Sequence, residues 1–524
     1  MNKEININAV GRTLEHFWSK CVGAGRANEG LRMAWQNQLK RVKKECGFEY
    51  IRFHGLFHDD MCVYRVISGE EIFNFQYIDE LFDALLEIGV RPFVELGFMP
   101  VDMASGETTQ FWWKGNVTPP VEWKKWETLI DKTVRHFIER YGIDEVRRWY
   151  FEVWNEPNLH NGFWTGGKSG YFQMYKVSVQ CIKAIDKSLR VGGPVTSNYV
   201  PDARFDGEFD DKTKHMTHKL ENLDDGDWQP VWVKDFIDYC EKEQLPVDFI
   251  STHPYPTDFA LDGHGETRGK SRNVNSTFED LSLIRKIIDE SPYKDAEIHL
   301  TEWSSSPSSR DHSHDFPPAA AFVVKANIES RGLVNSLSYW TFTDIFEEVG
   351  AGNRAFHGGF GMINYQGVIK PSFYAYKFLN SIGDIEIGNG ENYIVTKDDK
   401  TGKCSILAYN YRSNSFNCAV PMTNSFESAE QVAETGAASS LKLTVNGFTK
   451  GTLFSVESVD KESGCAMDLY KKMGYPSSPN HEEIRLLKSV SESIRTDIIL
   501  ADDDGVLNLD IKMNPWEIML IKEL

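Results

Sequence analysis

Between residues 14 and 380, short apolar and aromatic-rich runs alternate with longer segments whose apolar residues recur at i, i+3, i+4 and i+7. The short runs predict buried β-strands, and the longer segments predict amphipathic helices. The predicted strands are HFWSKCVG (16–23), YIRFHG (50–55), RPFVELGF (91–98), WYFEVWNE (149–156), RVGGPV (190–195), DFISTHPY (248–255), EIHLTEW (297–303) and SLSYWTFTD (336–344). Successive strand–helix units of this kind are typical of an α/β fold whose parallel strands close into a (β/α)8 TIM barrel.

The segments between the strands have the length and spacing of surface helices. Several end in glycine, the residue that most often follows the last turn of a helix. The predicted helices cover residues 31–47, 77–89, 121–142, 171–187, 233–243 and 278–290. We therefore assign residues 14–380 to the barrel.

After residue 380 the pattern changes to alternating strands. Residues 393–411 predict a hairpin around the turn DKTG, and residues 441–460 and 506–524 have a similar pattern. We predict an accessory β-sandwich-like domain made of residues 1–13 and 381–524, with a small helical insertion near 465–492.

Charge and cysteine spacing exclude several classes of function. The net charge is −20 and the sequence pI is near 5.2, which argues against a nucleic-acid partner because phosphate binding needs a basic surface. No apolar run reaches the ~18 residues of a membrane span. The eight cysteines contain no CxxC pair, so we expect free thiols and a cytoplasmic protein, or a periplasmic or secreted one if a leader was trimmed.

Active sites of barrels of this kind lie at the carboxyl ends of the strands. The side chains predicted there are His54, His58, Glu95, Asn155, Glu156, His253, Tyr255, Glu302, Trp303, Trp340 and Asp344. Two carboxylates among Trp, Tyr and His residues suit glycoside hydrolysis, in which one carboxyl group protonates the leaving oxygen and the other attacks or activates water. No third ligand at zinc spacing follows His54 and His58, so we expect no metal site, a structural role for His58 and sugar binding by His54.

Glu156 and Glu302 are the predicted catalytic pair. Pro157 disfavours the α region for Glu156, so we expect an extended strand end there, with Asn155 and Glu156 on opposite faces. Neighbouring aromatic residues should raise the pKa of Glu156 by desolvation, as a general acid requires. On the other strand, Ile298, Leu300 and Glu302 are expected to share the face that points into the barrel.

The two segments FEVWNEPN and LTEWSSS resemble the acid/base and nucleophile strands of clan A glycoside hydrolases. Further runs are similar to glycoside hydrolase family 39, namely CVGAGRA (21–27), RFHGLFHDDM (52–61), YWTFTDIFEE (339–348) and FHGGFGMINYQGVIKPSFYAYKFLN (356–380). The family contains β-xylosidases and α-L-iduronidases, both retaining. HGLFHDD, THPYP and TEWSSSP resemble the β-xylosidase branch.

The resemblance implies Glu156 as acid/base, Glu302 as nucleophile and no cofactor. It implies that Asn155 bonds the sugar 2-hydroxyl and that the Trp340–Thr341 peptide is cis. The other substrate-binding positions that it implies are His54, His253, Tyr255, Trp340, Phe346, Glu348, Glu347, Trp112 and Trp164.

On this basis we expect an exo-acting β-xylosidase that releases xylose from the non-reducing ends of xylo-oligosaccharides. Two alternatives stay open. One is a same-family exo-glycosidase of other specificity (arabinopyranosidase, β-galactosidase, β-glucosidase or iduronidase-like), and the other is a carbohydrate-binding barrel without turnover. The polar segment 201–229 is longer than in similar xylosidases. It could cap the aglycone side, change oligomer contacts, shift the glycone preference or remain a solvated loop. Homo-oligomers, dimers or tetramers, are common in similar proteins.

Overall fold

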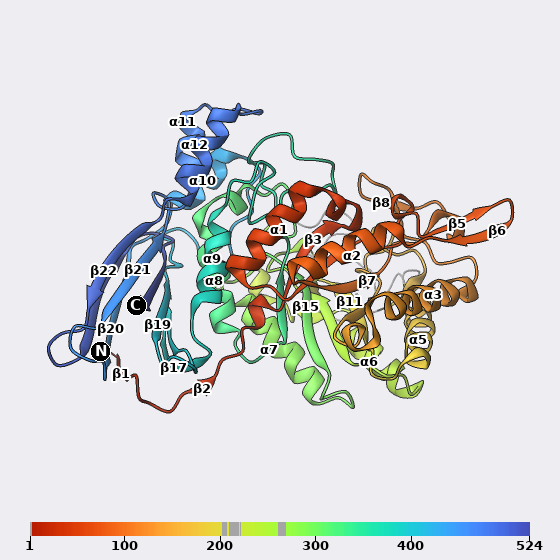
Figure 1. Ribbon diagram of the computed structural model, residues 1–524, viewed down its shortest axis with the longest axis horizontal. Coiled ribbons are helices and arrows are strands. Elements are labelled where there is room, and N and C mark those ends of the chain that lie inside the picture. The colour runs from red at the N-terminus through yellow and green to blue at the C-terminus, as the bar shows by residue number, and fades with distance from the viewer. Residues whose placement is uncertain (1–2, 202–206, 209–219, 221, 260–268) are drawn as a thin grey trace.

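A computed structural model describes residues 3–201, 207–208, 220, 222–259 and 269–524. Within these ranges, eight parallel strands pair in chain order, and the last pairs with the first to close a barrel. They are β3 (Cys21–Arg26), β4 (Tyr50–His54), β7 (Arg91–Leu96), β10 (Tyr150–Val153), β11 (Arg190–Ser197), β14 (Phe249–His253), β15 (Glu297–Trp303) and β16 (Ser336–Tyr339). The predicted (β/α)8 barrel is confirmed (Figure 1).

Helices surround the barrel, each of the main ones following a strand. They are α1 (Met33–Cys46), α2 (Gln76–Ile88), α3 (Trp123–Tyr141), α5 (Gly167–Ile185), α6 (Val233–Lys242), α7 (Ser276–Asp289), α8 (Pro317–Glu329) and α9 (Pro371–Ser381). Helix α2 buries Ile78, Leu81, Phe82 and Leu85 on one face and ends at Gly89, whose φ of 88° is the left-handed conformation that glycine adopts most readily.

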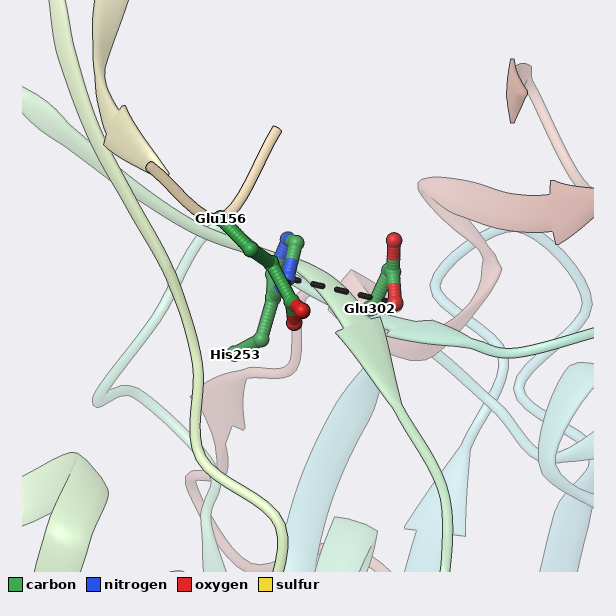
Figure 2. Close-up of side chains that lie close together, drawn as sticks. All are labelled: Glu156, His253 and Glu302. Atoms are coloured by element: carbon green, nitrogen blue, oxygen red, sulfur yellow. Dashed lines mark hydrogen bonds and ion pairs between the residues drawn. The ribbon is translucent and has the colours of Figure 1, made fainter. Parts of the chain in front are cut away.

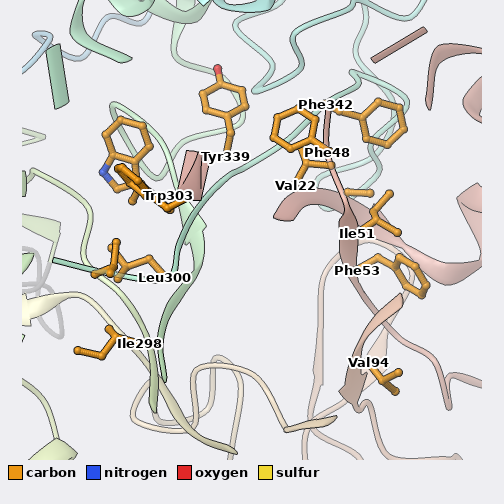
Figure 3. Close-up of a cluster of buried hydrophobic side chains, with 14 of the residues drawn as sticks. Val22, Phe48, Ile51, Phe53, Val94, Ile298, Leu300, Trp303, Tyr339 and Phe342 are labelled. Atoms are coloured by element: carbon orange, nitrogen blue, oxygen red, sulfur yellow. The ribbon is translucent and has the colours of Figure 1, made fainter. Parts of the chain in front are cut away.

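Alternate residues of the barrel strands point to two different environments. Side chains such as Ile51, Phe53 and Val94 belong to the apolar cluster between barrel and helices (Figure 3). The residues between them point inward, because side chains alternate along a strand. On β4 the inward residues are Tyr50, Arg52 and His54, which share the interior with Phe93, Glu95, Tyr150, Glu152, Phe249, His253, His299 and Thr301.

Several predicted strands are shorter than their sequence patterns, and two of them differ most. Residues 16–23 were predicted as one strand, but Phe17–Ser19 form a 3₁₀ turn and β3 starts at Cys21. Residues 336–344 were predicted as another, but β16 ends at Tyr339, directly before the cis peptide between Trp340 and Thr341. In both places the apolar residues are buried but belong to no strand. The apolar pattern alone does not distinguish a buried strand from buried residues outside a strand.

The second part of the molecule is a two-sheet β-structure that contains both ends of the chain (Figure 1). Its larger sheet has the order β2 (Arg12–Thr13), β17 (Ile385–Gly390), β18 (Tyr393–Lys397), β19 (Cys404–Tyr409), β24 (Ile518–Glu523), β21 (Leu453–Val459), β22 (Arg495–Leu500). The smaller has the order β1 (Lys3–Asn6), β20 (Ser439–Asn446), β23 (Val506–Met513). The two sheets share an apolar cluster that includes Ile406, Leu443 and Ile521, as a sandwich requires.

Only one of the three predicted hairpins forms. Strands β18 and β19 pair antiparallel around DKTG. By contrast, β20 and β21 lie in different sheets, and so do β23 and β24. The hairpin prediction for 441–460 and 506–524 is therefore wrong, because each pair of strands buries its apolar face against the opposite sheet rather than pairing edge to edge.

Three short helices complete the second part: α10 (Phe426–Glu434), α11 (Met467–Lys472) and α12 (His481–Glu492). The last two are the predicted helical insertion, and they pack in a small apolar cluster of their own around Phe356, Tyr470 and Leu487. None of the helices in the described ranges is long and apolar enough to cross a membrane. Most of the 201–229 segment, about which two readings were open, lies outside the described residues.

Candidate active site

Glu156 and Glu302 lie together at the carboxyl ends of the barrel strands. One carboxyl oxygen of each and a ring nitrogen of His253 all lie within 4.8 Å of one another. Figure 2 shows the three side chains converging from separate segments of the chain. Both glutamates are about 5% exposed. The structure therefore brings the two predicted carboxylates into one buried site.

An irregularity in β15 turns Glu302 into this site. The pairing of β15 with β16 shifts between Leu300 and Trp303, so that β15 carries one extra residue there. Before the shift, Ile298 and Leu300 belong to the cluster between barrel and helices, while His299 contacts aromatic rings of the barrel interior. The expectation that Ile298, Leu300 and Glu302 share one face was wrong, because the bulge reverses the alternation.

The end of β10 is irregular as well. Strand β10 stops at Val153, Trp154 has a φ of 76°, and Glu156 has a φ of 44°. The predicted extended conformation at Glu156 is therefore wrong: Pro157 disfavours the right-handed α region, and the residue takes the left-handed one. Since the alternation is broken, Asn155 and Glu156 both reach the site.

Arg52 lies at the centre of the site, and sequence reasoning missed it. Its guanidinium is fully buried, donates hydrogen bonds to Glu152, Glu302 and Asn155, and forms an ion pair with Glu95. Nε lies 2.5 Å from Glu152, Nη1 lies 2.7 Å from Glu302, and Nη2 lies 2.7 Å from the Asn155 oxygen and 3.0 Å from Glu95. An arginine in the middle of a predicted buried strand was the available signal, since such a charge needs partners.

His253 joins Glu156 to the barrel interior. Its Nδ1 lies 2.9 Å from Oε1 of Glu156, and its Nε2 lies 2.9 Å from the hydroxyl of Thr301. Burial lowers the pKa of His253 to about 4, so its ring is neutral near pH 7. Burial also raises the pKa of Glu156 to about 7, against an opposing hydrogen bond from Ser197 and the nearby charge of Arg52. Glu156 is thus a carboxyl group that can hold a proton at neutral pH.

Two further side chains contact Glu302. The hydroxyl of Tyr255 donates to Oε2 of Glu302 over 3.3 Å. His54 lies between three carboxyl groups, with Nδ1 2.6 Å from Glu95 and Nε2 3.5 Å from Glu302 and 3.8 Å from Glu348. Burial lowers the pKa of His54 to about 4 as well. Neutral His54 can therefore donate one hydrogen bond to Glu95 and offer its other nitrogen to a ligand.

The carboxylate pair opens into a cavity of about 720 Å³, a volume typical of small-molecule sites. Of the predicted residues, His54, Trp112, Glu156, Tyr255, Glu302, Trp340 and Glu348 line it. Residues on its wall that were not predicted are Gln110, Phe111, Leu159, Phe163, Ser197, Asn198, Phe259, Pro307, Ser308, Ser309, Arg310, Val349 and Phe360. Gln110 and Phe111 follow β7 and belong to the hairpin of β8 (Thr109–Gln110) and β9 (Gly115–Asn116), an insertion whose position no strand-end rule predicts.

Five predicted substrate contacts do not line the cavity, and three of them, Trp164, Phe346 and Glu347, are held elsewhere. Trp164 is fully buried, packs on Trp154 and donates to the carbonyl of Gly167, so its place is in the core. Glu347 points to two arginines, Arg26 and Arg32, at 3.0 Å and 2.6 Å. Phe346 packs behind the wall, against Trp340 and Phe360. In each case adjacency in sequence to a cavity residue did not bring the side chain to the cavity. Asn155 and His253 do not line the cavity either; Asn155 bonds to Arg52, and His253 bonds to the lining residue Glu156.

Glu156, His253 and Glu302 are also the one set of potential metal ligands found among the described residues. A histidine that binds a metal needs a free nitrogen lone pair aimed at the ion. Both nitrogens of His253 already have partners in Glu156 and Thr301, and Arg52 occupies one oxygen of Glu302. This donor set fits a network of internal hydrogen bonds better than a cation.

His58, to which a structural role was assigned, lies 2.8 Å from Asp60 and packs edge-on against Trp113. The Trp340–Thr341 peptide is cis, as the resemblance implied.

Comparison with known proteins identifies relatives over nearly the whole chain. Residues 1–498 match the model of the glycosyl hydrolases family 39. The chain is 38% identical to a β-xylosidase of Caldicellulosiruptor saccharolyticus (91% of this chain, 89% of the relative) and 34% identical to one of Geobacillus stearothermophilus (99% and 95%). Among solved structures, a monomeric β-xylosidase from Caulobacter crescentus CB15 superimposes with a TM-score of 0.83 at 32% identity, covering 99% of this chain and 98% of the other.

Proposed function

The chain belongs to glycoside hydrolase family 39, and on that premise we propose that it is a retaining β-xylosidase that works by double displacement. Its substrates are short xylo-oligosaccharides, from which it removes single xylose units at the non-reducing end. The β-xylosidases at 34–38% identity support the xylose assignment. The exo mode is part of this proposal and is an expectation from the resemblance to the β-xylosidase branch.

The observation that carries the mechanism is the short distance between the two carboxyl groups. Retaining enzymes hold them ~5–5.5 Å apart, whereas inverting enzymes need ~6.5–9.5 Å to admit a water molecule. Here the nearest oxygens of Glu156 and Glu302 lie within 4.8 Å. This short separation falls with the retaining rather than the inverting range, which supports attack on the sugar by one of the two carboxylates.

In the first step, Glu302 attacks the anomeric carbon and forms the glycosyl–enzyme ester, while Glu156 gives its proton to the departing glycosidic oxygen. Arg52 contacts one oxygen of Glu302 and helps to orient the carboxylate that attacks. Burial raises the pKa of Glu156 to about 7, so this carboxyl group can hold the proton that the leaving oxygen needs.

In the second step, Glu156 is a carboxylate and removes a proton from water. The resulting hydroxide equivalent attacks the anomeric carbon, the bond to Glu302 breaks, and β-xylose leaves with Glu156 protonated again. Two inversions give net retention.

The remaining groups bind the sugar in this proposal. Asn155, whose oxygen is held by Arg52, offers its amide N–H₂ to the 2-hydroxyl. That amide nitrogen has no hydrogen-bond partner in the described structure, as expected of a donor whose partner is the substrate. Tyr255 orients Glu302, His54 and Glu348 bond hydroxyl groups, and Trp340 supplies an apolar face.

The test is steady-state hydrolysis of p-nitrophenyl glycosides (xyloside, arabinopyranoside, galactoside, glucoside) by the wild type, Glu302→Ala and Glu156→Ala. We expect the β-xyloside to be the preferred substrate and both variants to lose activity by several orders of magnitude. Azide should restore Glu156→Ala with β-xylosyl azide as product, because an anionic nucleophile needs no base. It should not restore that product in Glu302→Ala.

Other results would identify the alternatives. Preference for another glycoside would leave the mechanism intact and refute the xylose assignment. Binding of xylose without turnover by the wild type would indicate a carbohydrate-binding barrel. Full activity of either variant would show that the carboxylate pair is not the site.

The cytoplasm is the compartment that we propose, which the free state of all eight cysteines supports. A dimer or tetramer stays a prediction, to be measured by light scattering.

A further inference from the structure

The hydroxyl of Thr301 connects two buried side chains, Glu152 and His253. Its hydroxyl donates to Oε1 of Glu152 over 2.8 Å, and the same oxygen lies 2.9 Å from Nε2 of His253. Thr301, Glu152 and His253 are all completely buried. The three therefore form a fixed chain of hydrogen bonds that ends, through Nδ1 of His253, at Glu156.

Counting hydrogens along this chain determines where each proton lies. A hydroxyl has one hydrogen, and a carboxylate can only accept. Glu152 is ion-paired with Arg52 over 2.5 Å, so the hydrogen of Thr301 must point to Glu152. The contact between Thr301 and His253 then needs a hydrogen on Nε2 of the histidine. Because a neutral imidazole carries only one, Nδ1 presents a lone pair to Glu156.

We propose that Thr301, held by Glu152, is a positioning residue that fixes His253 in the Nε2–H tautomer, so that Nδ1 accepts a hydrogen bond from protonated Glu156 in the free enzyme. This inference rests on the proposed function, since it concerns the acid of that reaction. By this inference, Thr301 helps to keep Glu156 protonated before the substrate binds.

The opposite tautomer would have the opposite effect. With its hydrogen on Nδ1, His253 would donate to an ionised Glu156 and stabilise the form that cannot protonate a leaving group. The two tautomers of an isolated imidazole are close in energy, so a hydrogen bond at the other nitrogen decides between them. The lowered pKa of His253, mainly due to burial, agrees with a neutral ring.

Other charged groups face the pair and act on every variant alike. Glu302, Arg52, Glu152 and His54 surround His253, with Oε2 of Glu302 3.9 Å from its Nδ1. His54, Arg52 and Glu95 act on Glu156, and Ser197 donates to it. Of all these groups, only Thr301 contacts Nε2 of His253, so a change confined to its hydroxyl tests the tautomer alone.

The experiment compares Thr301→Val with Thr301→Ser. Valine keeps the shape and removes the hydroxyl, which frees His253 to move its hydrogen to Nδ1, whereas serine keeps the hydroxyl. The readout is the pH dependence of kcat/KM on p-nitrophenyl β-xyloside, which reports ionisation in the free enzyme.

We expect the basic limb of Thr301→Val to move to lower pH by about one unit, the size of one hydrogen bond, while Thr301→Ser follows the wild type. A basic limb of Thr301→Val that coincides with the wild type would overturn the inference. So would an equal shift in Thr301→Ser, since it would follow from disturbed packing and not from loss of the hydroxyl.

Neutron diffraction from wild-type crystals at about pH 6 gives a reading that needs neither folding of the variant nor turnover. Deuterium on Nε2 of His253 and on Oε1 of Glu156 supports the inference, and deuterium on Nδ1 of His253 overturns it. If the wild type hydrolyses none of the aryl glycosides, the proposed function fails and the neutron map still decides the tautomer.

Discussion

Nη1 of Arg52 lies 2.7 Å from Oε1 of Glu302, and both side chains are buried. The same guanidinium contacts Glu152 and Glu95, so three carboxyl groups in the barrel share one cation. This arrangement makes the site and the stability of the barrel depend on the same residue.

Arg52→Met should therefore destabilise the fold as well as abolish activity. Removing one partner of a buried ion pair typically costs ~3–5 kcal/mol, because the remaining charges lose their compensation. Urea denaturation measures this loss. The control is Arg65→Met, which removes a half-exposed pair with Asp102 and should cost less than ~1 kcal/mol. Equal effects of the two changes would contradict the central role of Arg52.

Hydrolysis should decline as the pH rises through about 7. Glu156 must be protonated to act as an acid, and burial raises its pKa to about 7, so the active form is lost above that value. The decline should be steep for substrates with poor leaving groups. It should be nearly absent for a 2,4-dinitrophenyl xyloside, whose leaving group needs no proton. The same basic limb with both substrates would show that another group titrates.

Two adjacent glutamates should respond differently to the same change. Glu348 lines the cavity, and burial together with Glu302 and Glu156 holds its pKa well above the usual range. Glu348→Gln should lower kcat/KM by ~10-fold, the loss of about one hydrogen bond, with little change in Tm. Glu347→Gln breaks contacts with Arg26 and Arg32, so Tm should fall while kcat/KM changes little. A lower kcat/KM for Glu347→Gln and a lower Tm for Glu348→Gln would instead identify Glu347 as the substrate contact.

Two tryptophans provide a second contrast. Trp112 lines the cavity and is 65% exposed, so Trp112→Ala should raise KM and change the free energy of unfolding by less than ~0.5 kcal/mol, as is usual at exposed positions. Trp164 is fully buried, and Trp164→Ala should cost ~3–5 kcal/mol. Urea unfolding and initial rates on the same samples distinguish the two. A Trp164→Ala variant of unchanged stability with a raised KM would show that Trp164 contacts the substrate.

Lys370 should be essential for the fold around the loop after β16. Its ammonium lies 2.8 Å from Asp315 and 2.8 Å from Asp344, and all three are buried. Lys370→Met leaves two uncompensated carboxylates, so we expect a loss of ~3–5 kcal/mol in unfolding free energy. Lys377→Met is the matched control, because its pair with Glu45 is partly exposed. A loss no larger than that of the control would refute this account.

The sequence by itself determined the barrel, the order of its strands and the two catalytic candidates. Periodicity is enough for this, because a helix and a strand each require a particular spacing of apolar residues to bury one face. Helix α8 was not predicted from this spacing. It is buried along its whole length, so it has no polar face and no helical period to detect. The residues after each strand could be named because parallel strands end at one rim.

Only the tertiary structure decided how the side chains at that rim are turned. The bulge in β15 and the left-handed backbone at Trp154 and Glu156 reverse the alternation from which directions were predicted. Whether a residue such as Trp164 reaches the cavity or the core depends on loops folded over the strand ends. Likewise, Arg52 became the centre of the site through partners on β7, β10 and β15. Such contacts join residues far apart in the chain, and local pattern carries no information about them.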